Sequence, residues 1–400
     1  MSSVLHKLGP LTPQRLSSSL GWRWNTTRRN VKLARRWRGQ KPRVYVHPEQ
    51  PNPIWRTYVT HPPVRYAPYP IAHTCHWVSS IAVPMPLPHI GPLNHIYEVE
   101  HPLILAEQIN KHRDGRIMCD WHRLLSEADD VNRLVAQPSC KIVVTFSWGL
   151  VEHFRQFIAP ELWHKLDWAY PAYPEQAEAS EAAGQEHGKG DKPFNILVIA
   201  SRWSDKGVPE ALRALEILRA RHSDRVRMTL VSQAVPAGTV LPAGVELFDV
   251  PLMSPELKAR LYRSADALLL PNYGETAACF PEAYAFGVPV VTTRIHHDDE
   301  FVREGRTGYL IETPIYAFSE GFGRRWQTSE EFIADLEARR DRGELEPVIE
   351  QCVAHLETLM ACSDVAGMKR ACRAFHVERF SPQARNRQLR ALYHAALPSS

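Results

Sequence analysis

Residues 194–207 read FNILVIASRWSDKG, and this stretch decides the fold of the second half of the chain. Its first seven residues are almost all apolar, which is typical of a strand buried on both faces of a parallel sheet. The charged turn SRWSDKG follows directly, and a helix is expected to open at Pro209, because proline suits the first helical turn. A strand, a charged turn and a helix in this order predict a ligand site at the carboxyl end of the strand.

Strands and helices alternate through the remainder of this half. One face of the helix after SRWSDKG is predicted to be apolar, through Val208, Leu212, Leu215 and Leu218. The other predicted elements are strands at 226–232, 267–271, 288–293 and 307–311 and helices at 255–265 and 282–286. Such alternation predicts parallel β-α-β units in a doubly wound sheet.

The first half of the chain carries weaker signals of secondary structure. Its predicted elements are strands at 44–47, 95–101 and 141–147 and a helical region around 103–136. Residues 48–92 are dense in proline and aromatic residues and cannot hold long helices. Residues 175–193 are polar and low in complexity, which indicates a linker. The predicted fold class is therefore α/β, with two Rossmann-like doubly wound domains facing a central cleft.

Length and composition agree with two globular domains. The chain has 400 residues, against about 150 for one domain, with 44% hydrophobic and 23% charged residues. It has no run of about 18 apolar residues, so we do not expect it to cross a bilayer. The seven cysteines include no C-x-x-C pair, which argues against a zinc knuckle or a disulfide framework. We expect a reducing, cytoplasmic compartment.

A basic arm precedes the first domain. Residues 1–48 hold eleven Lys or Arg and no Asp or Glu, so the rest carries −7 of a total net charge of +4. Three tryptophans (Trp22, Trp24 and Trp37) lie among these cations. One interpretation is peripheral contact with an anionic membrane. The alternatives are a transit peptide and a solvated or packed arm. Binding of nucleic acid would rest on this arm alone and is not expected.

Two clusters carry chemistry. In SRWSDKG, Arg202 and Lys206 flank a turn before a helix, where fixed positive charge and backbone N–H groups could hold a diphosphate. In PNYGETAACFPEAYAFGVPVVTT (271–293), Glu275 and Glu282 bracket a loop, and a carboxylate at a strand end commonly binds ribose hydroxyls. The alternatives are an ordinary turn with solvated charges and two surface glutamates at a helix start.

In order and spacing these segments resemble the C-terminal domain of the retaining GT-B glycosyltransferases of family 4. The matching run is SRWSDKG, GVELFDVPLMSPELKARLYRSADALLLP, the double-glutamate segment and EFVREGRTGYLI (300–311). The tail at 370–393 looks like the closing helices of that family. The implied organisation is an arm at 1–42, an acceptor-side domain at 43–174, a linker at 175–193, a nucleotide-sugar-binding domain at 194–369 and helices at 370–400 that cross back to the first domain.

The resemblance implies metal-independent transfer of a sugar from a nucleotide-diphosphate sugar, with retention at the anomeric carbon and with no other cofactor. Arg202 and Lys206 match the pair that holds the diphosphate, and Glu282 matches the glutamate that binds the ribose. Glu275 is the nearest match to the glutamate that contacts the donor sugar. The residues implied to complete the donor site are Gly274, Thr276 and Phe280.

The spacing departs from the family pattern, because six residues rather than seven separate Glu275 from Glu282. The family spacing would put Gly274 at the first position. The catalytic histidine implied for the first domain is His101, with His95 and His122 as alternatives. The sequence does not identify the acceptor, and a glycan, a lipid-linked molecule and a small molecule stay open. Competing hypotheses are a catalytically silent relative that binds nucleotide sugar, an epimerase and a phosphorylase.

Overall fold

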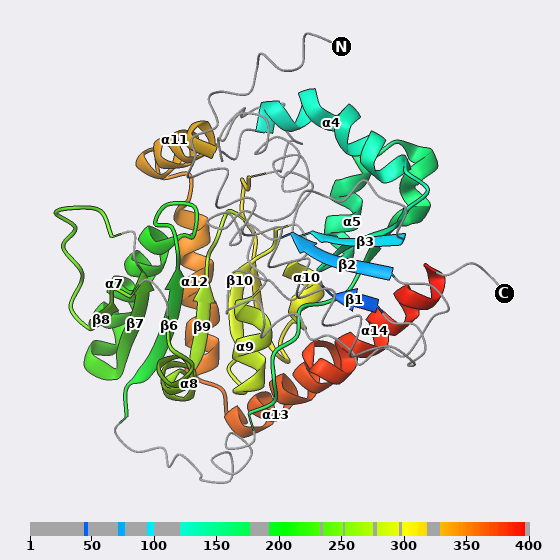
Figure 1. Cartoon of the computed structure of the whole chain (residues 1–400). Coiled ribbons are helices and arrows are strands. Elements are labelled where there is room, and N and C mark those ends of the chain that lie inside the picture. The colour runs from blue at the N-terminus through cyan, green and yellow to red at the C-terminus, as the bar shows by residue number, and fades with distance from the viewer. Residues whose placement is uncertain are drawn as a thin grey trace, which may run out of the picture.

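The protein is described here by a computed structural model that covers residues 44–46, 71–76, 94–99, 121–176, 192–232, 235–250, 253–274, 278–295, 298–317 and 329–396. Two separate sheets organise these residues, and every pairing within them is parallel (Figure 1). The predicted arm at 1–42, nearly all of the predicted linker, His101, Glu275 and Thr276 lie outside the described residues.

The first sheet has the strand order β1-β2-β3-β4-β5. Its strands are β1 (Val44–Val46), β2 (Ile71–His76), β3 (Asn94–Val99), β4 (Cys140–Thr145) and β5 (Leu166–Trp168). The predictions included β1, β3 and β4 but missed β2 and β5. β2 lies within the proline-rich stretch and gains its ladder from β1 and β3 on either side. Pairing, rather than the residues' own preference, makes it a strand.

The second sheet has the order β11-β10-β9-β6-β7-β8. Its strands are β6 (Phe194–Ala200), β7 (Val226–Ser232), β8 (Val245–Phe248), β9 (Ala267–Leu270), β10 (Val290–Thr293) and β11 (Gly308–Ile311). The chain runs from β6 out to β8, returns beside β6 as β9 and then runs out the other way. This is the order of a doubly wound sheet, with its switch point between β6 and β9. The prediction of an α/β chain built on parallel sheets is confirmed.

Helices cover both faces of the second sheet. The helices of the described residues are α4 (Trp121–Ala136), α5 (Trp148–Arg155), α7 (Val208–His222), α8 (Pro255–Ser264), α9 (Cys279–Ala285), α10 (Asp298–Phe301), α11 (Ser329–Asp341), α12 (Glu346–Met360), α13 (Val365–Phe375) and α14 (Pro382–Ala395), with short η3 (Pro160–Lys165), η4 (Ser223–Arg225) and η5 (His376–Phe380). Within this part of the chain, none is both long and apolar enough to cross a membrane.

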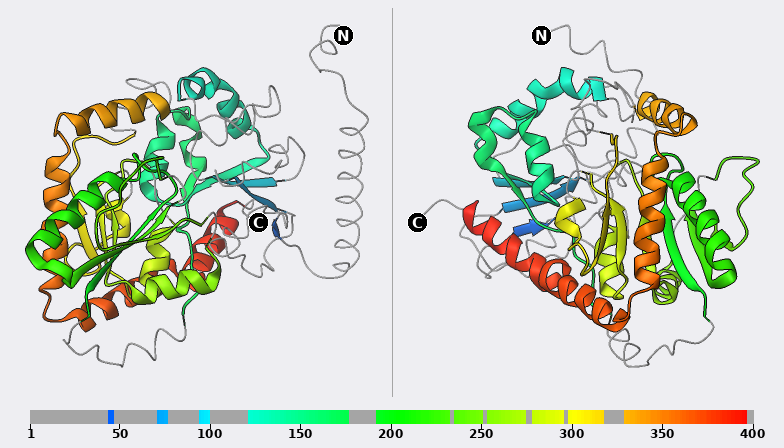
Figure 2. Two further views of the ribbon diagram at one scale, coloured as in Figure 1. Left: turned by 90° about the vertical axis from the view of Figure 1, so that its left-hand side faces the viewer. Right: turned by 180° about the vertical axis from the view of Figure 1, so that it is seen from behind.

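Alternation along β6 shows how the faces are divided. Ile196 and Val198 belong to a buried cluster with α7 and α12, whereas Leu197 belongs to another with α8 and α9. The predicted apolar face of α7 lies in the first of these clusters. Figure 2 shows α12 beside α7. Because both faces are covered, ligands can reach this sheet at the ends of its strands.

The C-terminal helices lead from the second sheet to the first (Figure 1). One buried cluster joins the first sheet with α14 through Ile96, Ile142, Val144, Ala169, Leu389, Leu392, Tyr393 and Ala396. Arg385 of α14 donates to Glu98 of β3 at 2.6 Å, and both side chains are fully buried. The same guanidinium donates to the carbonyl oxygens of Ala169 and Tyr170, each at 2.8 Å.

A second set of hydrogen bonds joins the regions of the two sheets through Glu300 of α10. Its carboxylate accepts hydrogen bonds from the backbone N–H groups of Trp148 and Gly149, the first two residues of α5. It also accepts one from the Tyr170 hydroxyl at 2.8 Å. A carboxylate at a helix N-terminus satisfies N–H groups that have no partner inside the helix. Glu300 therefore fixes α5 of the first domain against α10 of the second.

Near this junction, His376 in η5 gives stability a pH dependence. The ring is buried and lies 2.9 Å from the Tyr173 carbonyl oxygen, and burial lowers its pKa to about 4. Between pH 6.5 and pH 4 the unfolded chain binds a proton that the folded chain does not, so stability falls as pH falls. From pH 7 to pH 5 this group alone should lower the free energy of unfolding by about 2 kcal/mol.

Urea unfolding of the His376→Gln variant at both pH values measures this contribution. The glutamine amide can still donate to the carbonyl, so the loss of stability between pH 7 and pH 5 should shrink by about 2 kcal/mol. The His164→Gln variant, at an exposed position, is the control. An unchanged loss in His376→Gln would contradict the assignment.

Candidate functional site

Three of the predicted site residues, Arg202, Lys206 and Gly274, lie in the loops after β6 and β9, which meet. These strands are neighbours in the sheet, and the switch point lies between them. The backbone N–H of Tyr273 donates to the carbonyl oxygen of Asp205 at 2.7 Å, which joins the two loops. Gly207 has a φ of +65°, and a Cβ atom there would lie 1.9 Å from the Pro271 carbonyl oxygen. Glycine thus allows the SRWSDKG turn to lie directly against the loop after β9.

Arg202 is held by a carboxylate from its own turn. Its Nε lies 2.6 Å and its Nη2 2.5 Å from Asp205 Oδ2. The Arg202 side chain is 54% exposed, whereas that of Asp205 is 6% exposed. A guanidinium that is oriented by a carboxylate and still more than half exposed is a preorganised site for an anion.

Gly274, a predicted donor-site residue, lies beside this pair. A Cβ atom at Gly274 would be 3.2 Å from Asp205 Oδ2 and 3.4 Å from Arg202 Nη2. Two predicted residues separated by 72 positions in the sequence are therefore neighbours in space. Glu275 and Thr276, which follow, lie outside the described residues, and their roles stay predictions.

Glu282 is buried in α9 and bound by two side chains of α8. Lys258 forms an ion pair with one carboxylate oxygen, and the Tyr262 hydroxyl donates to the other at 2.8 Å. Burial raises the pKa of Tyr262, so its hydroxyl keeps the proton that it donates. Burial also raises the pKa of Glu282 and lowers the pKa of Lys258 to about 8. Ribose binding by Glu282 stays a prediction and would require a hydroxyl to share these oxygens.

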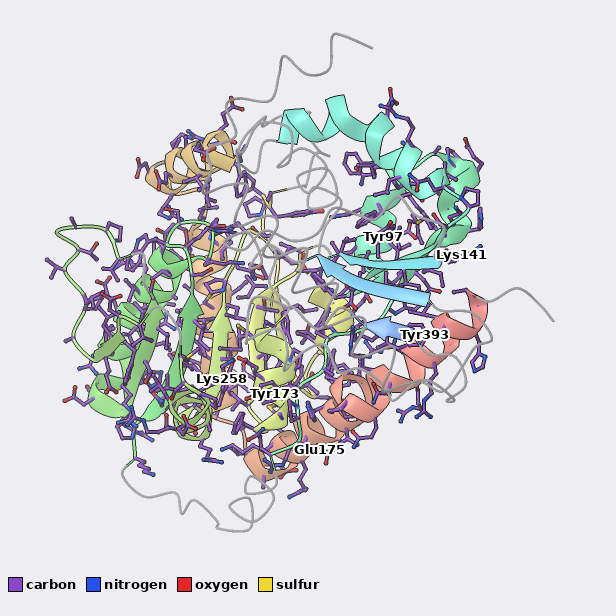
Figure 3. The ribbon with its side chains drawn as sticks, in the orientation of Figure 1. Tyr97, Lys141, Tyr173, Glu175, Lys258 and Tyr393 are labelled. Carbon is purple, nitrogen blue, oxygen red and sulfur yellow. The ribbon has the colours of Figure 1, made fainter. Side chains whose placement is uncertain are left out.

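Positive charge extends from Arg202 toward α8. Lys206 and Lys258 lie close enough to Cys279 for their charges to oppose the rise that burial causes in its pKa. Lys258 Nζ also lies 5.9 Å from the centre of the Tyr173 ring, and Figure 3 shows these two side chains next to each other. The cations near the switch point thus come from two elements, the turn after β6 and α8.

Phe280 lies in the hydrophobic core. Its side chain is 0% exposed, and its ring centre is 5.0 Å from that of Phe301. Its side chain therefore packs in the core, and its predicted part in the donor site stays a prediction. His101 lies outside the described residues. Of its alternatives His95 and His122, only the backbone is described, so the choice between the histidines stays open.

Three residues of the site were missing from the sequence predictions: Asp205, Lys258 and Tyr262. Asp205 lies within the quoted turn, three residues after Arg202, and a salt-bridge pattern could have revealed it. Lys258 and Tyr262 are four residues apart on α8, so they share a face. The sequence alone does not show which element this face of α8 contacts, because that depends on the order of the strands in the sheet.

Comparison with known proteins finds a family match within the second domain. Residues 193–324 match the family model described as "Glycosyl transferases group 1". This segment, about a third of the chain, is similar to that family. The matched segment contains both loops of the site, from Arg202 to Gly274, and the Glu282 helix.

Similar proteins extend the comparison beyond this segment. The D-inositol 3-phosphate glycosyltransferase of Pseudarthrobacter chlorophenolicus is 28% identical over 262 residues, which are 61% of this chain and 59% of the relative. The chain thus spans less than two thirds of that relative. The protein of the same name from Arthrobacter sp. is 31% identical over 132 residues, 30% of this chain and 31% of the relative.

Two solved structures are also similar. One is WaaG, a glycosyltransferase involved in lipopolysaccharide biosynthesis, with 16% identity, a TM-score of 0.49, and coverage of 82% of this chain and 78% of WaaG. The other is a glycosyltransferase from Rickettsia africae, with 14% identity, a TM-score of 0.49, and coverage of 83% and 91%.

Proposed function

We propose that this protein is a glycosyltransferase that moves a sugar from a nucleotide-diphosphate sugar to an acceptor, without a metal ion and with retention at the anomeric carbon. The observation that carries the proposal is the fixed guanidinium of Arg202 at the switch point of a group 1 domain. Retention and independence of metal rest on the resemblance to family 4 alone.

The site residues have distinct parts in this reaction. When the bond between the anomeric carbon and the diphosphate breaks, negative charge develops on the leaving diphosphate. Arg202 and Lys206 stabilise that charge, and Arg202 needs little reorganisation because Asp205 already orients it. Glu282 binds the ribose hydroxyls, held in place by Lys258 and Tyr262. Closure of the two domains over the donor would exclude water and limit its hydrolysis.

We propose that the acceptor binds to the first domain. We propose that His101 acts near the donor sugar there, with His95 and His122 as the variants to compare. The two relatives described above are named for inositol 3-phosphate, so a phosphorylated polyol is the first small acceptor to assay. Lipid-linked acceptors are the next to assay, since the basic arm at 1–42 is proposed to contact anionic membrane. Glycan acceptors come after them. A cytoplasmic location is part of the same proposal.

A thermal-shift screen tests the donor site. We expect one of UDP-glucose, GDP-mannose, ADP-glucose and dTDP-glucose to raise the Tm, because a ligand at 100 times its Kd adds about 2.7 kcal/mol of stability. The rise should be lost or greatly reduced in the Glu282→Gln variant. It should persist in Glu256→Gln, which changes an exposed glutamate at the start of α8.

Other outcomes separate the competing hypotheses. No rise with any nucleotide sugar would contradict the proposal. Binding without release of nucleoside diphosphate to any acceptor would indicate a silent relative. Turnover of the donor without an acceptor would indicate an epimerase, and dependence on phosphate would indicate a phosphorylase.

A further inference from the structure

The two carboxylate oxygens of Asp205 differ in their hydrogen bonding: one has a partner and the other has none among the described residues. Oδ2 accepts a hydrogen bond from Arg202 Nε and forms an ion pair with Arg202 Nη2. Oδ1 is buried and has no hydrogen-bond partner among the described residues. The residue as a whole is 4% exposed. A buried charged acceptor without a partner is costly, and such atoms are rare in native proteins. A function that supplies a donor to Oδ1 would explain why it is kept.

The surroundings of Asp205 indicate what kind of donor would reach it. The carboxylate lies at the switch point, beside the guanidinium proposed to hold the diphosphate. Gly274 approaches it from the loop after β9, at the position where the family spacing would place the sugar-binding glutamate. Glycine has no carboxylate to offer, and the atoms nearest to its missing side chain are Asp205 Oδ2 and Arg202 Nη2. Among the described residues, the carboxylate at this place is that of Asp205, from the loop after β6.

We propose that Asp205 is a specificity-determining residue that contacts the donor sugar. Its Oδ1 accepts a hydrogen bond from a sugar hydroxyl, and its Oδ2 holds Arg202 against the diphosphate. The inference rests on the proposed function, because it needs a sugar linked to a diphosphate. Hydroxyls are the chemical match, since a buried carboxylate oxygen forms its strong hydrogen bonds with O–H and N–H donors.

The Asp205→Asn variant tests the inference while keeping the shape of the side chain. The amide oxygen would face Arg202, and the amide nitrogen would put a donor where Oδ1 accepts. The affinities to measure by calorimetry are those of the nucleotide sugar that raises the wild-type Tm and of its free nucleoside diphosphate. We expect the nucleotide sugar to bind about tenfold more weakly, and the nucleoside diphosphate to change less than about twofold.

Matched variants complete the experiment. Asp224→Asn makes the same change in the ion pair with Arg219, outside the site, and should leave both affinities unchanged. If Asp205→Asn fails to fold, Gly274→Ala tests the same place, since its Cβ would lie 3.2 Å from Asp205 Oδ2. That methyl group should also weaken binding of the nucleotide sugar more than binding of the nucleoside diphosphate.

Two results would overturn the inference while leaving the proposed function intact. Equal weakening of both ligands would mean that Asp205 acts through Arg202 alone. Unchanged affinity for both would mean that Oδ1 contacts neither. Failure of the wild-type protein to bind any nucleotide sugar would instead refute the proposed function itself, and the inference with it.

Discussion

Replacing Arg385 with methionine should lower the free energy of unfolding by about 3–5 kcal/mol. The change removes the partner of Glu98 and leaves that carboxylate buried without a counter-charge. It also removes the N–H donors from the carbonyl oxygens of Ala169 and Tyr170. Chemical denaturation at pH 7, with the transition followed by tryptophan fluorescence, gives the size of the loss.

Two further variants make this result specific. Arg387→Met changes an exposed arginine of the same helix, and the free energy of unfolding should move by no more than about 0.5 kcal/mol. Adding Glu98→Leu to Arg385→Met should recover much of the loss, because a buried pair can be replaced as a whole by apolar residues. A loss below about 1 kcal/mol in Arg385→Met would show that the pair is not buried in solution.

Replacing Lys206 with alanine should lower turnover on the order of 10²–10³-fold. The lysine would stabilise charge that develops on the departing diphosphate, so its effect should fall mainly on kcat. The measurement is release of nucleoside diphosphate from the nucleotide sugar found by thermal shift, with its acceptor present. Arg202→Ala should have an effect of similar size, since the fixed guanidinium lies in the same turn.

Arg213→Ala is the matched control for these variants. It removes an exposed cation from the helix that follows the turn, where Arg213 pairs with Glu216. Its turnover should stay close to that of the wild-type protein. Full turnover in Lys206→Ala would refute the assigned role of this lysine.

Much of the second domain could be predicted because its elements carry local signals. β6 is an unbroken apolar run, and α7 opens with proline and buries a regular apolar face. Of the strands in that sheet, β8 was missed. Its four residues are half-buried or exposed, so it lacks the apolar run that marks the others. Its position at the edge of the sheet explains that pattern, since an edge strand is covered less than a central one.

The site was predictable in its cations and less so in its carboxylates. Arg202 and Lys206 follow a strand directly, and strand ends are where this fold binds ligands. The partners of Glu282 come from α8, and their spacing in the sequence gives no sign of the helix they face. Which loop meets which depends on the sheet order, and that order results from packing of the whole domain. The approach of Gly274 to the Arg202–Asp205 pair could therefore be found only in three dimensions.

The packing of α14 on the first sheet affects how the protein can be made. Ile96, Ile142 and Val144 face Leu389, Leu392 and Tyr393, so the layer that covers this sheet comes from a distant part of the sequence. A ribosome supplies those residues only after the entire second domain has been synthesised. Domains usually fold in the order of their synthesis. Here the first sheet must wait with an apolar face uncovered until the second domain is complete, so its early exposure is a risk for aggregation on the ribosome.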